Sequence, residues 1–352
     1  MKPSNVFGRR YALLKDELKK RDLDSFLVTK GASVSYLSGF RGHDAAILAA
    51  RGRQYFIADS RYLEEAKDTV KGFEIVLSKR SMYETVHEIV REERPKRLGF
   101  ESMDLPYEVA RRLKTYAGKA AIMPVKDLVE DLRIIKDAGE VALIKNSMRL
   151  TERVFGRMLQ YIRTGVSEAS LAAEITLDFI RSGGKIGFDP IVAVDSNSSK
   201  PHSTPGDRRI AKNSYLMIDM GCELSGYNSD LTRIVVRGKL RPEISRIYEI
   251  VRDAQAMAIA AIKPGAKIAK IDSIARSYIK NKGFGEYFGH ALGHGVGLEV
   301  HEKPAISPLT EGSLRAGMVF TVEPAIYIPK VGGIRIEDMI LVTENGCEVL
   351  SC

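Results

Sequence analysis

Tyr161-Ile-Arg-Thr-Gly-Val-Ser-Glu-Ala-Ser-Leu171 is a stretch that returns about one hundred residues later as Ala261-Ile-Lys-Pro-Gly-Ala-Lys-Ile-Ala-Lys-Ile271. Both stretches continue into a helical pattern, and both predicted helices end at a glycine, Gly183 or Gly283. Glycine is favoured there because the residue after a helix often adopts a left-handed conformation. The repeat therefore predicts two similar halves in the second part of the chain, related by a pseudo-twofold axis.

Each copy also supplies two carboxylates at the edges of strand-like runs: Asp219 and Asp230 in the first copy, and Glu323 and Glu337 in the second. An acid beside a buried apolar run costs free energy unless a cation or a partner compensates it. Together with His294, which lies among glycines, the four acids predict a cage for two divalent metal ions. Such ligands suit manganese first, with cobalt, zinc or iron as alternatives. The ions would balance a charge of about −4 and lower the pKa of a bridging water.

Further polar residues accompany the predicted cage. His202 and His301 occur at corresponding places in the two copies, and the glycine-rich segment 288–301 also carries His290. A histidine beside a carbonyl group can stabilise a developing oxyanion. Arg335 lies two residues before Glu337 in a strand-like run, which predicts that both side chains point to the same face. Arg335 is therefore expected to orient a carboxylate or to meet substrate.

Residues 1–126 show a different pattern, in which helix-like and strand-like segments alternate. Helices are expected at 9–21, 60–68, 82–93 and 107–116, strands at 25–29, 73–77 and 97–100, and a hairpin at 45–49 and 54–58. This alternation predicts an α/β domain with a mainly parallel or mixed sheet. Apolar residues at helical spacing in 127–163 predict two helices that join it to a second domain at 127–352. The whole chain is thus expected to be of the α/β (α+β) class.

Composition and charge narrow the class of protein. The net charge of +9 comes mostly from residues 1–126, which hold 25 Lys and Arg against 17 Asp and Glu. These charges are scattered and mixed, which argues against nucleic-acid binding. No apolar run approaches the ~18 residues of a membrane span. Cys222, Cys347 and Cys352 form no CxxC pair, and this sparse set favours a reducing, cytoplasmic setting.

Six motifs resemble the proline-specific metallopeptidases of the pita-bread fold, namely aminopeptidase P and prolidase (Xaa-Pro dipeptidase). The resemblance covers nearly the whole chain, because Tyr36-Leu-Ser-Gly-Phe40 is similar to the creatinase-type N-terminal domain of that family. The six motifs are Lys200-Pro-His-Ser-Thr204, Ile218-Asp-Met-Gly221, Ser229-Asp-Leu-Thr-Arg233, Gly293-His-Gly-Val-Gly-Leu-Glu-Val-His-Glu302, Thr321-Val-Glu-Pro-Ala-Ile-Tyr327 and Gly333-Ile-Arg-Ile-Glu-Asp338.

The resemblance implies hydrolysis of the bond between an N-terminal residue and proline, with a homodimer as the usual assembly. It also implies the site roles. Asp219 would bind one ion, Asp230 and Glu337 would bridge both, and His294 and Glu323 would bind the other. Glu323 would also be the general acid and base. His290 and His301 would stabilise the tetrahedral intermediate, His202 would contact the substrate, and Tyr227 and Arg335 would support the site.

One position bears on the length of the substrate. Many prolidases carry an arginine there that grips the free carboxylate of a dipeptide, whereas this sequence has Ala305. Lys303 or an arginine of the N-terminal domain is the alternative group for that role. We therefore expect an Xaa-Pro aminopeptidase that accepts longer peptides, with a dipeptidase as the alternative. A non-catalytic peptide- or nucleic-acid-binding protein on the same fold is a remote alternative, because such relatives typically lose the ligands that are all present here.

Overall fold

The computed structural model describes residues 3–351, which form two compact units. Along the chain, the first unit ends at Arg133 and the second begins at Ile134. The division lies after the predicted boundary at 126/127, because helix α6 (Leu128–Arg133) packs against helices of the first unit. The Tyr36 hydroxyl, for example, donates a hydrogen bond to the carbonyl oxygen of Leu132. Half of the predicted helical join therefore belongs to the first unit, and the long second helix to the second.

The first unit is built on a six-stranded mixed sheet in the order β4-β3-β2-β1-β5-β6. Strands β2 and β3 form the predicted antiparallel hairpin, whereas β3–β4, β1–β5 and β5–β6 are parallel pairs. The strands are β1 (Ser25–Val28), β2 (Ala45–Ala49), β3 (Gln54–Asp59), β4 (Glu74–Ser78), β5 (Arg97–Glu101) and β6 (Ala121–Val125). The prediction of a mainly parallel or mixed sheet is confirmed.

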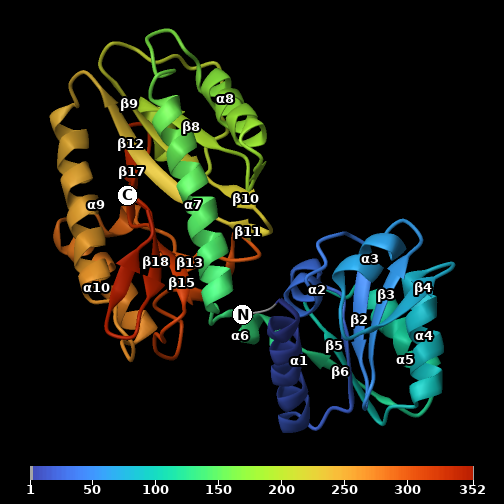
Figure 1. Cartoon of the computed structure of the whole chain (residues 1–352). Coiled ribbons are helices and arrows are strands. Elements are labelled where there is room, and N and C mark those ends of the chain that lie inside the picture. Colours follow the sequence, from blue (N-terminus) through green and yellow to red (C-terminus); the bar gives the residue numbers. More distant parts are fainter. Residues whose placement is uncertain (1–2, 352) are drawn as a thin grey trace. The chain divides into compact units, whose positions relative to one another are not determined.

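Helices cover this sheet, and α4 and α5 bury the apolar face formed by Leu27, Leu48, Ile57 and Leu98 (Figure 1). The helices of this unit besides α6 are α1 (Pro3–Lys20), α2 (Gly31–Ser38), α3 (Leu63–Thr69), α4 (Met82–Glu93) and α5 (Tyr107–Tyr116). The helix predicted at 60–68 begins later in the structure, because α3 starts after Tyr62. Helix α2 was not predicted.

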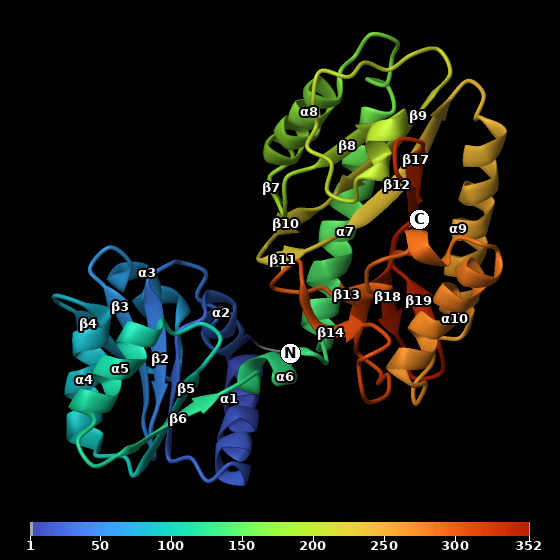
Figure 2. The same cartoon turned by 180° about the vertical axis from the view of Figure 1, so that it is seen from behind.

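The second unit contains the repeat, and the structure confirms it. The helices α8 (Glu168–Arg181) and α10 (Ile268–Asn281) have the same length and are followed by Gly183 and Gly283, both with positive φ. Helix α8 packs on α7 (Ala138–Met158), and α10 packs on α9 (Pro242–Ala260). Figures 1 and 2 show these two helix pairs flanking the strands of the unit from either side.

The strands of the second unit form separate sheets for the two halves. The first half has the orders β12-β9-β8 and β11-β10-β7, and the second half has β14-β13-β15-β18-β19 and β16-β17. The bounds are β7 (Lys185–Ile186), β8 (Ile191–Val194), β9 (Ser214–Met220), β10 (Cys222–Leu224), β11 (Tyr227–Asn228), β12 (Leu231–Arg237), β13 (Gly293–Gly295), β14 (Glu302–Ile306), β15 (Val319–Val322), β16 (Ala325–Ile328), β17 (Gly332–Arg335), β18 (Asp338–Val342) and β19 (Cys347–Val349); short 3-10 turns are η1 (Asp195–Ser199) and η2 (Gly285–Tyr287).

Two further expectations concern the whole chain. Within residues 3–351, the structure has no helix that is both long and apolar enough to cross a membrane. Cys222 is buried and Cys347 is partly buried, and both are free thiols. Cys352 lies outside the described residues.

Candidate active site

A cavity of about 870 Å³ in the second unit gathers nearly all of the predicted site residues. It lies between the strands of the two halves, so side chains from both copies of the repeat meet in it. The predicted residues in its wall are Asp219, Asp230, His202, His290, His294, His301, Glu323, Arg335 and Glu337. Among the predicted residues only Tyr227 is missing from this lining.

The strand pairing explains why the four acids converge. In the first half β9 pairs with β12, so that Asp219 lies opposite Thr232 and Asp230 directly precedes β12. In the second half β15 pairs with β18, and Glu323 directly follows Val322, the partner of Asp338. Each antiparallel pair therefore carries its two carboxylates at one end.

Glu337 differs from its prediction in one respect. The predicted strand 333–337 ends at Arg335, and Glu337 lies in the short connection between β17 and β18, which belong to different sheets. Alternation along one strand therefore does not bring Arg335 and Glu337 together. Both side chains are nevertheless buried and reach the same cavity.

The acids affect one another strongly. Burial, and then the neighbouring carboxylates, raise the pKa of Asp230 and Glu323 well above the usual range. Burial followed by the charge of Asp219 raises the pKa of Glu337 to about 8. Without a cation, such a cluster takes up protons instead of holding all of its charges. The cluster of carboxylates is therefore suited to bind a cation.

His294 has the form that a metal ligand requires. Burial lowers its pKa to about 4, so its imidazole is neutral at pH 7. Its Nδ1 lies 3.2 Å from the carbonyl oxygen of Gly295, and since a carbonyl only accepts, Nδ1 carries the proton. Nε2 then presents a lone pair, 3.6 Å from Asp230 Oδ2 and 3.4 Å from Glu323 Oε1. A backbone carbonyl that fixes the tautomer in this way is typical of metal-bound histidine.

The donor set fits a divalent cation. Ligand atoms of Asp230, His294 and Glu337 lie within 4.8 Å of one another. Asp219 Oδ1 is buried and has no hydrogen-bond partner among the described residues. Acceptor atoms that converge without donors between them are stabilised by a cation. These residues can therefore hold a metal ion.

Arg335 links the acids to the wall of the cavity. It is buried, its Nη2 donates to Asp219 Oδ2 at 2.5 Å, and its Nε donates to Thr232 Oγ1. Its Nη1 donates to the hydroxyl of Tyr327, which also lines the cavity. In the sequence, Tyr327 stands only at the end of a motif, and no role was predicted for it. Tyr327 lies in β16, two residues after Ala325, which is the partner of Arg335 in β17. The spacing of residues in the sequence did not show this.

His290 is held by contacts that the sequence analysis did not find. Arg276 donates to the carbonyl oxygens of Phe288 and His290 and pairs with Asp272, which is fully buried. Asp272 also accepts from the backbone N–H of Leu292. The spacing of Asp272 and Arg276, four residues apart on α10, was the available signal.

The histidines in the wall differ in what they can donate. Burial lowers the pKa of His290 to about 4. Its Nδ1 lies 2.7 Å from the carbonyl oxygen of Ala291, so Nδ1 carries the proton and Nε2 is an acceptor without a hydrogen-bond partner among the described residues. His301 is exposed in the cavity, 4.1 Å from His294 between ring centroids, and His202 is exposed in the wall.

Tyr227 lies outside the lining of this cavity. It is buried in β11, and its hydroxyl donates to Glu140 Oε1 of α7 at 3.0 Å. Ile144, Met148 and Val296 surround it. Tyr227 was expected to support the site, and the structure places its ring between α7 and the sheets and outside the lining of the cavity.

Comparison with known proteins agrees with this geometry. Residues 142–344 match the model of metallopeptidase family M24. The chain belongs to the M24 family. Residues 10–135 match the creatinase/prolidase N-terminal domain. The predicted family, its fold and the class of enzyme, a metallopeptidase, are thus confirmed. Divalent metal ions are the cofactors implied by this family, and the cluster around Asp230, His294 and Glu337 fits them.

Several M24 relatives resemble the chain along its whole length. A Xaa-Pro dipeptidase of Pyrococcus horikoshii is 37% identical over 99% of this chain and 98% of the relative. The structure of a Xaa-Pro dipeptidase from Bacillus anthracis matches with a TM-score of 0.94 at 36% identity, covering 98% of this chain and 97% of the other. An X-Pro aminopeptidase from Thermotoga maritima gives 0.88 at 34%, covering 96% and 97%.

Proposed function

We propose that this M24 metallopeptidase hydrolyses the bond between an N-terminal residue and proline, using two divalent ions held by Asp219, Asp230, His294, Glu323 and Glu337. The observation that carries the proposal is the convergence of four carboxylates and a neutral imidazole in one cavity. The relatives at 34–37% identity, whose names specify Xaa-Pro substrates, support the choice of bond. Manganese is the first choice of metal.

The bound ions would supply a nucleophilic water and polarise the scissile carbonyl. We assign the movement of the proton to Glu323, because its carboxyl faces the cavity and because burial, and then the charge of Glu337, raise its pKa above the usual range. The leaving nitrogen of proline carries no hydrogen in the substrate, so it must receive a proton when the bond breaks. Glu323 faces the cavity. Its carboxylate can take a proton from the attacking water and pass it to the proline nitrogen.

The histidines and Arg335 arrange the substrate. Nε2 of His290 is an acceptor, so we assign it to a substrate N–H and not to the oxyanion. His301 and His202 are exposed in the cavity. We assign them as hydrogen-bond donors to the scissile carbonyl and to the substrate residue that follows the scissile bond. Arg335 holds Asp219 through its Nη2 and the wall through Pro201, so its role is to orient these groups.

The lining of the cavity supports the proposal that the substrate is longer than two residues. Ala305 lies in its wall, and Arg335 is the only lysine or arginine among the described residues that line it. Arg335 is already engaged with Asp219, Tyr327 and Thr232. A dipeptide's carboxylate would therefore find no uncommitted cation there. The finer proposal is an Xaa-Pro aminopeptidase, and the dipeptidase remains the second candidate because of the names of the relatives.

A substrate comparison tests the length preference. After loading with Mn²⁺, kcat/KM is measured for Xaa-Pro dipeptides and Xaa-Pro-Xaa tripeptides with the same first residue. We expect the tripeptide to be preferred, and Ala305→Arg to shift the preference toward the dipeptide. Cleavage of dipeptides alone by the unmodified enzyme would contradict the aminopeptidase proposal. Cleavage of neither peptide would contradict the choice of bond.

Removal of single ligands tests the metal assignment. Asp230→Ala and Glu337→Ala are expected to abolish activity and to lower the number of bound ions per chain, measured by elemental analysis. Full activity in both variants would exclude the bridging role. A homodimer in a reducing cytoplasm completes the proposal, and light scattering of the Mn²⁺-loaded protein measures its assembly.

A further inference from the structure

Glu168 is a fully buried carboxylate outside the cavity, at the first position of α8. An acid at a helix start is common, and its charge alone stabilises the helix. This side chain, however, leaves the helix and accepts hydrogen bonds from a distant loop. Burying a carboxylate is costly unless hydrogen bonds compensate it, so its partners show what the burial achieves.

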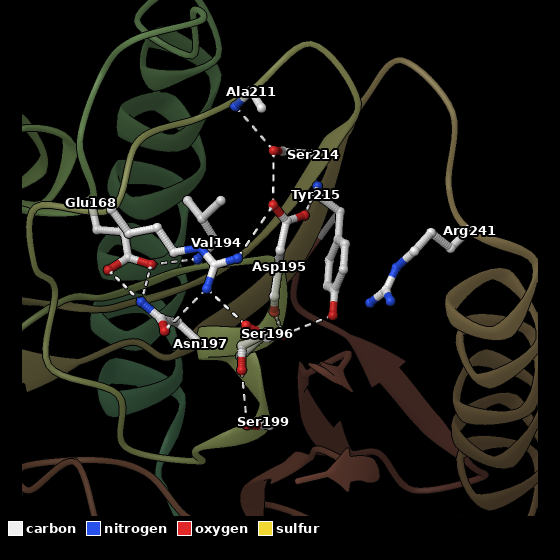
Figure 3. Close-up of polar contacts among 12 residues, drawn as sticks. Glu168, Val194, Asp195, Ser196, Asn197, Ser199, Ala211, Ser214, Tyr215 and Arg241 are labelled. Atoms are coloured by element: carbon white, nitrogen blue, oxygen red, sulfur yellow. Dashed lines mark hydrogen bonds and ion pairs between the residues drawn. The ribbon is translucent and has the colours of Figure 1, made fainter. Parts of the chain in front are cut away.

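The partners of Glu168 lie at the two ends of the segment 195–205. Oε1 accepts from the backbone N–H of Val194 at 2.7 Å, and Oε2 accepts from the backbone N–H of Gly206 at 3.1 Å. The side-chain amide of Asn197, within η1, donates to both oxygens (Figure 3). The backbone N–H of Ala169 also donates to the carbonyl oxygen of Gly206. One carboxylate therefore closes the base of this loop.

The far part of the same loop touches the catalytic cluster. The carbonyl oxygen of Pro201 accepts from Arg335, and Ser198 Oγ accepts from the backbone N–H of Gly333 in β17. His202 follows Pro201 and is exposed in the cavity wall. Asp195, at positive φ, ties the start of the loop to Ser214 and Tyr215 of β9 (Figure 3). The loop is thus held at its base by Glu168 and at its tip by Arg335.

We propose that Glu168 is a positioning residue for catalysis, which fixes the loop 195–205 so that His202 meets the peptide substrate. The proposal rests on the proposed function in one respect, namely that His202 contacts substrate. A carboxylate suits this task because its two oxygens accept from all three donors at once, whereas an amide would set a donor against an N–H. Displacement of a substrate-contacting group by about 1 Å can cost roughly a hundredfold in rate.

The second half of the unit uses the same arrangement for its own histidine loop. Asp272, on the repeat-related helix α10, is also fully buried and accepts from the backbone N–H of Leu292. Through Arg276 it also holds the carbonyl oxygens of Phe288 and His290. In both halves, an acid of the repeat helix thus secures a loop that brings a histidine into the cavity.

The test compares Glu168→Gln with Ser167→Ala, which removes the cap of the same helix and leaves the loop contacts in place. Peptide-resolved hydrogen exchange of residues 194–206 is measured together with kcat, KM and bound Mn²⁺. Glu168→Gln should speed exchange in this segment and lower kcat/KM roughly tenfold to a hundredfold, with Mn²⁺ content unchanged. Ser167→Ala should leave both the exchange and kcat/KM close to the unmodified enzyme.

The role of His202 is separated by the double variant. In a His202→Ala background, Glu168→Gln should lower kcat/KM by less than about threefold, because the group that it positions is already absent. An undiminished effect in that background, or unchanged exchange in the single variant, would overturn the proposal. If Glu168→Gln does not fold, Asn197→Ala replaces it with the same expected results. An enzyme inactive on Xaa-Pro peptides would refute the proposed function, while the exchange experiment would still decide the loop contact.

Discussion

The buried ion pair between Lys136 and Glu302 allows a quantitative prediction. Lys136 Nζ lies 2.7 Å from Glu302 Oε1, and the two side chains are only 1% and 4% exposed. The pair joins the chain just before α7 to the residue that follows His301. Lys136→Met keeps much of the length of the side chain but removes the buried ammonium group that faces Glu302.

Breaking a buried pair by removing one partner costs about 3–5 kcal/mol, because the remaining charge stays buried without compensation. In a unit of this size, each 1 kcal/mol shifts the melting temperature by about 2–4 °C. Lys136→Met should therefore lower the Tm by roughly 6–20 °C. Lys136→Met combined with Glu302→Leu removes both charges and should recover much of this loss. Activity should fall in the single variant because His301 neighbours the disturbed carboxylate.

Unfolding is followed by far-UV circular dichroism, since the chain has no tryptophan to report by fluorescence. The transition of the second unit is identified by its shift when Mn²⁺ is added. Lys145→Met is the matched control: Lys145 Nζ also lies 2.7 Å from Glu348 Oε1, but these side chains are 29% and 46% exposed. An exposed pair contributes at most about 1 kcal/mol. Equal losses in Lys136→Met and Lys145→Met would refute the burial argument.

Three further predictions concern other buried groups. The pKa of Glu337 is raised to about 8, so the metal-stripped fold favours the protonated carboxyl. This contribution to stability is fully present below the ordinary carboxyl pKa and is lost as the pH rises through about 8. Thermal unfolding between pH 5 and 9 should show the decline, and Glu337→Gln should flatten it. Tyr327→Phe removes the acceptor of Arg335 and should lower kcat/KM, whereas Tyr227→Phe should leave kcat/KM unchanged, and equal effects in the two variants would contradict the placement of these tyrosines. In the first unit, burial raises the pKa of Glu101 to about 7, so the stabilising contribution of its protonated carboxyl is lost as the pH rises through about 7. Urea unfolding at pH 5 and pH 8 should show this loss, and Glu101→Gln should remove it.

Glu101 also shows why one helix escaped prediction from the sequence. Helix α2 has an apolar interior but no side chain at its own start that caps it. The backbone N–H groups of Thr29 and Lys30 donate instead to Glu101 Oε2, from β5 and about seventy residues away. Helices α4 and α5 were predicted at their observed bounds because their apolar positions recur at helical spacing. An anchor of this kind, supplied by a distant strand to the residues just before the helix, leaves no such local signal.

The candidate site shows the same distinction between local and tertiary information. The carboxylates were predictable because each is an acid at the end of an apolar run, and a duplicated acid position is visible in one sequence. Tyr227 and Tyr327 could not be told apart in this way, since each lies in a short strand and they are one hundred residues apart, close to the offset of the repeat. Only the structure shows that one hydroxyl meets Glu140 and the other meets Arg335.

The interface between the two halves of the second unit passes through the site, and hydrogen bonds across it position the carboxylates. Thr232, in the first half, donates through Oγ1 to Glu337 Oε2 and accepts at its carbonyl oxygen from the Glu337 backbone N–H. Arg233 donates to the carbonyl oxygen of Glu337 and pairs with Asp338 at 2.7 Å. Because Glu337 lies between strands, these bonds from the other half are what hold it. Neither half could therefore position its acids alone, and the spacing of acids within one copy cannot specify the distances between the two pairs.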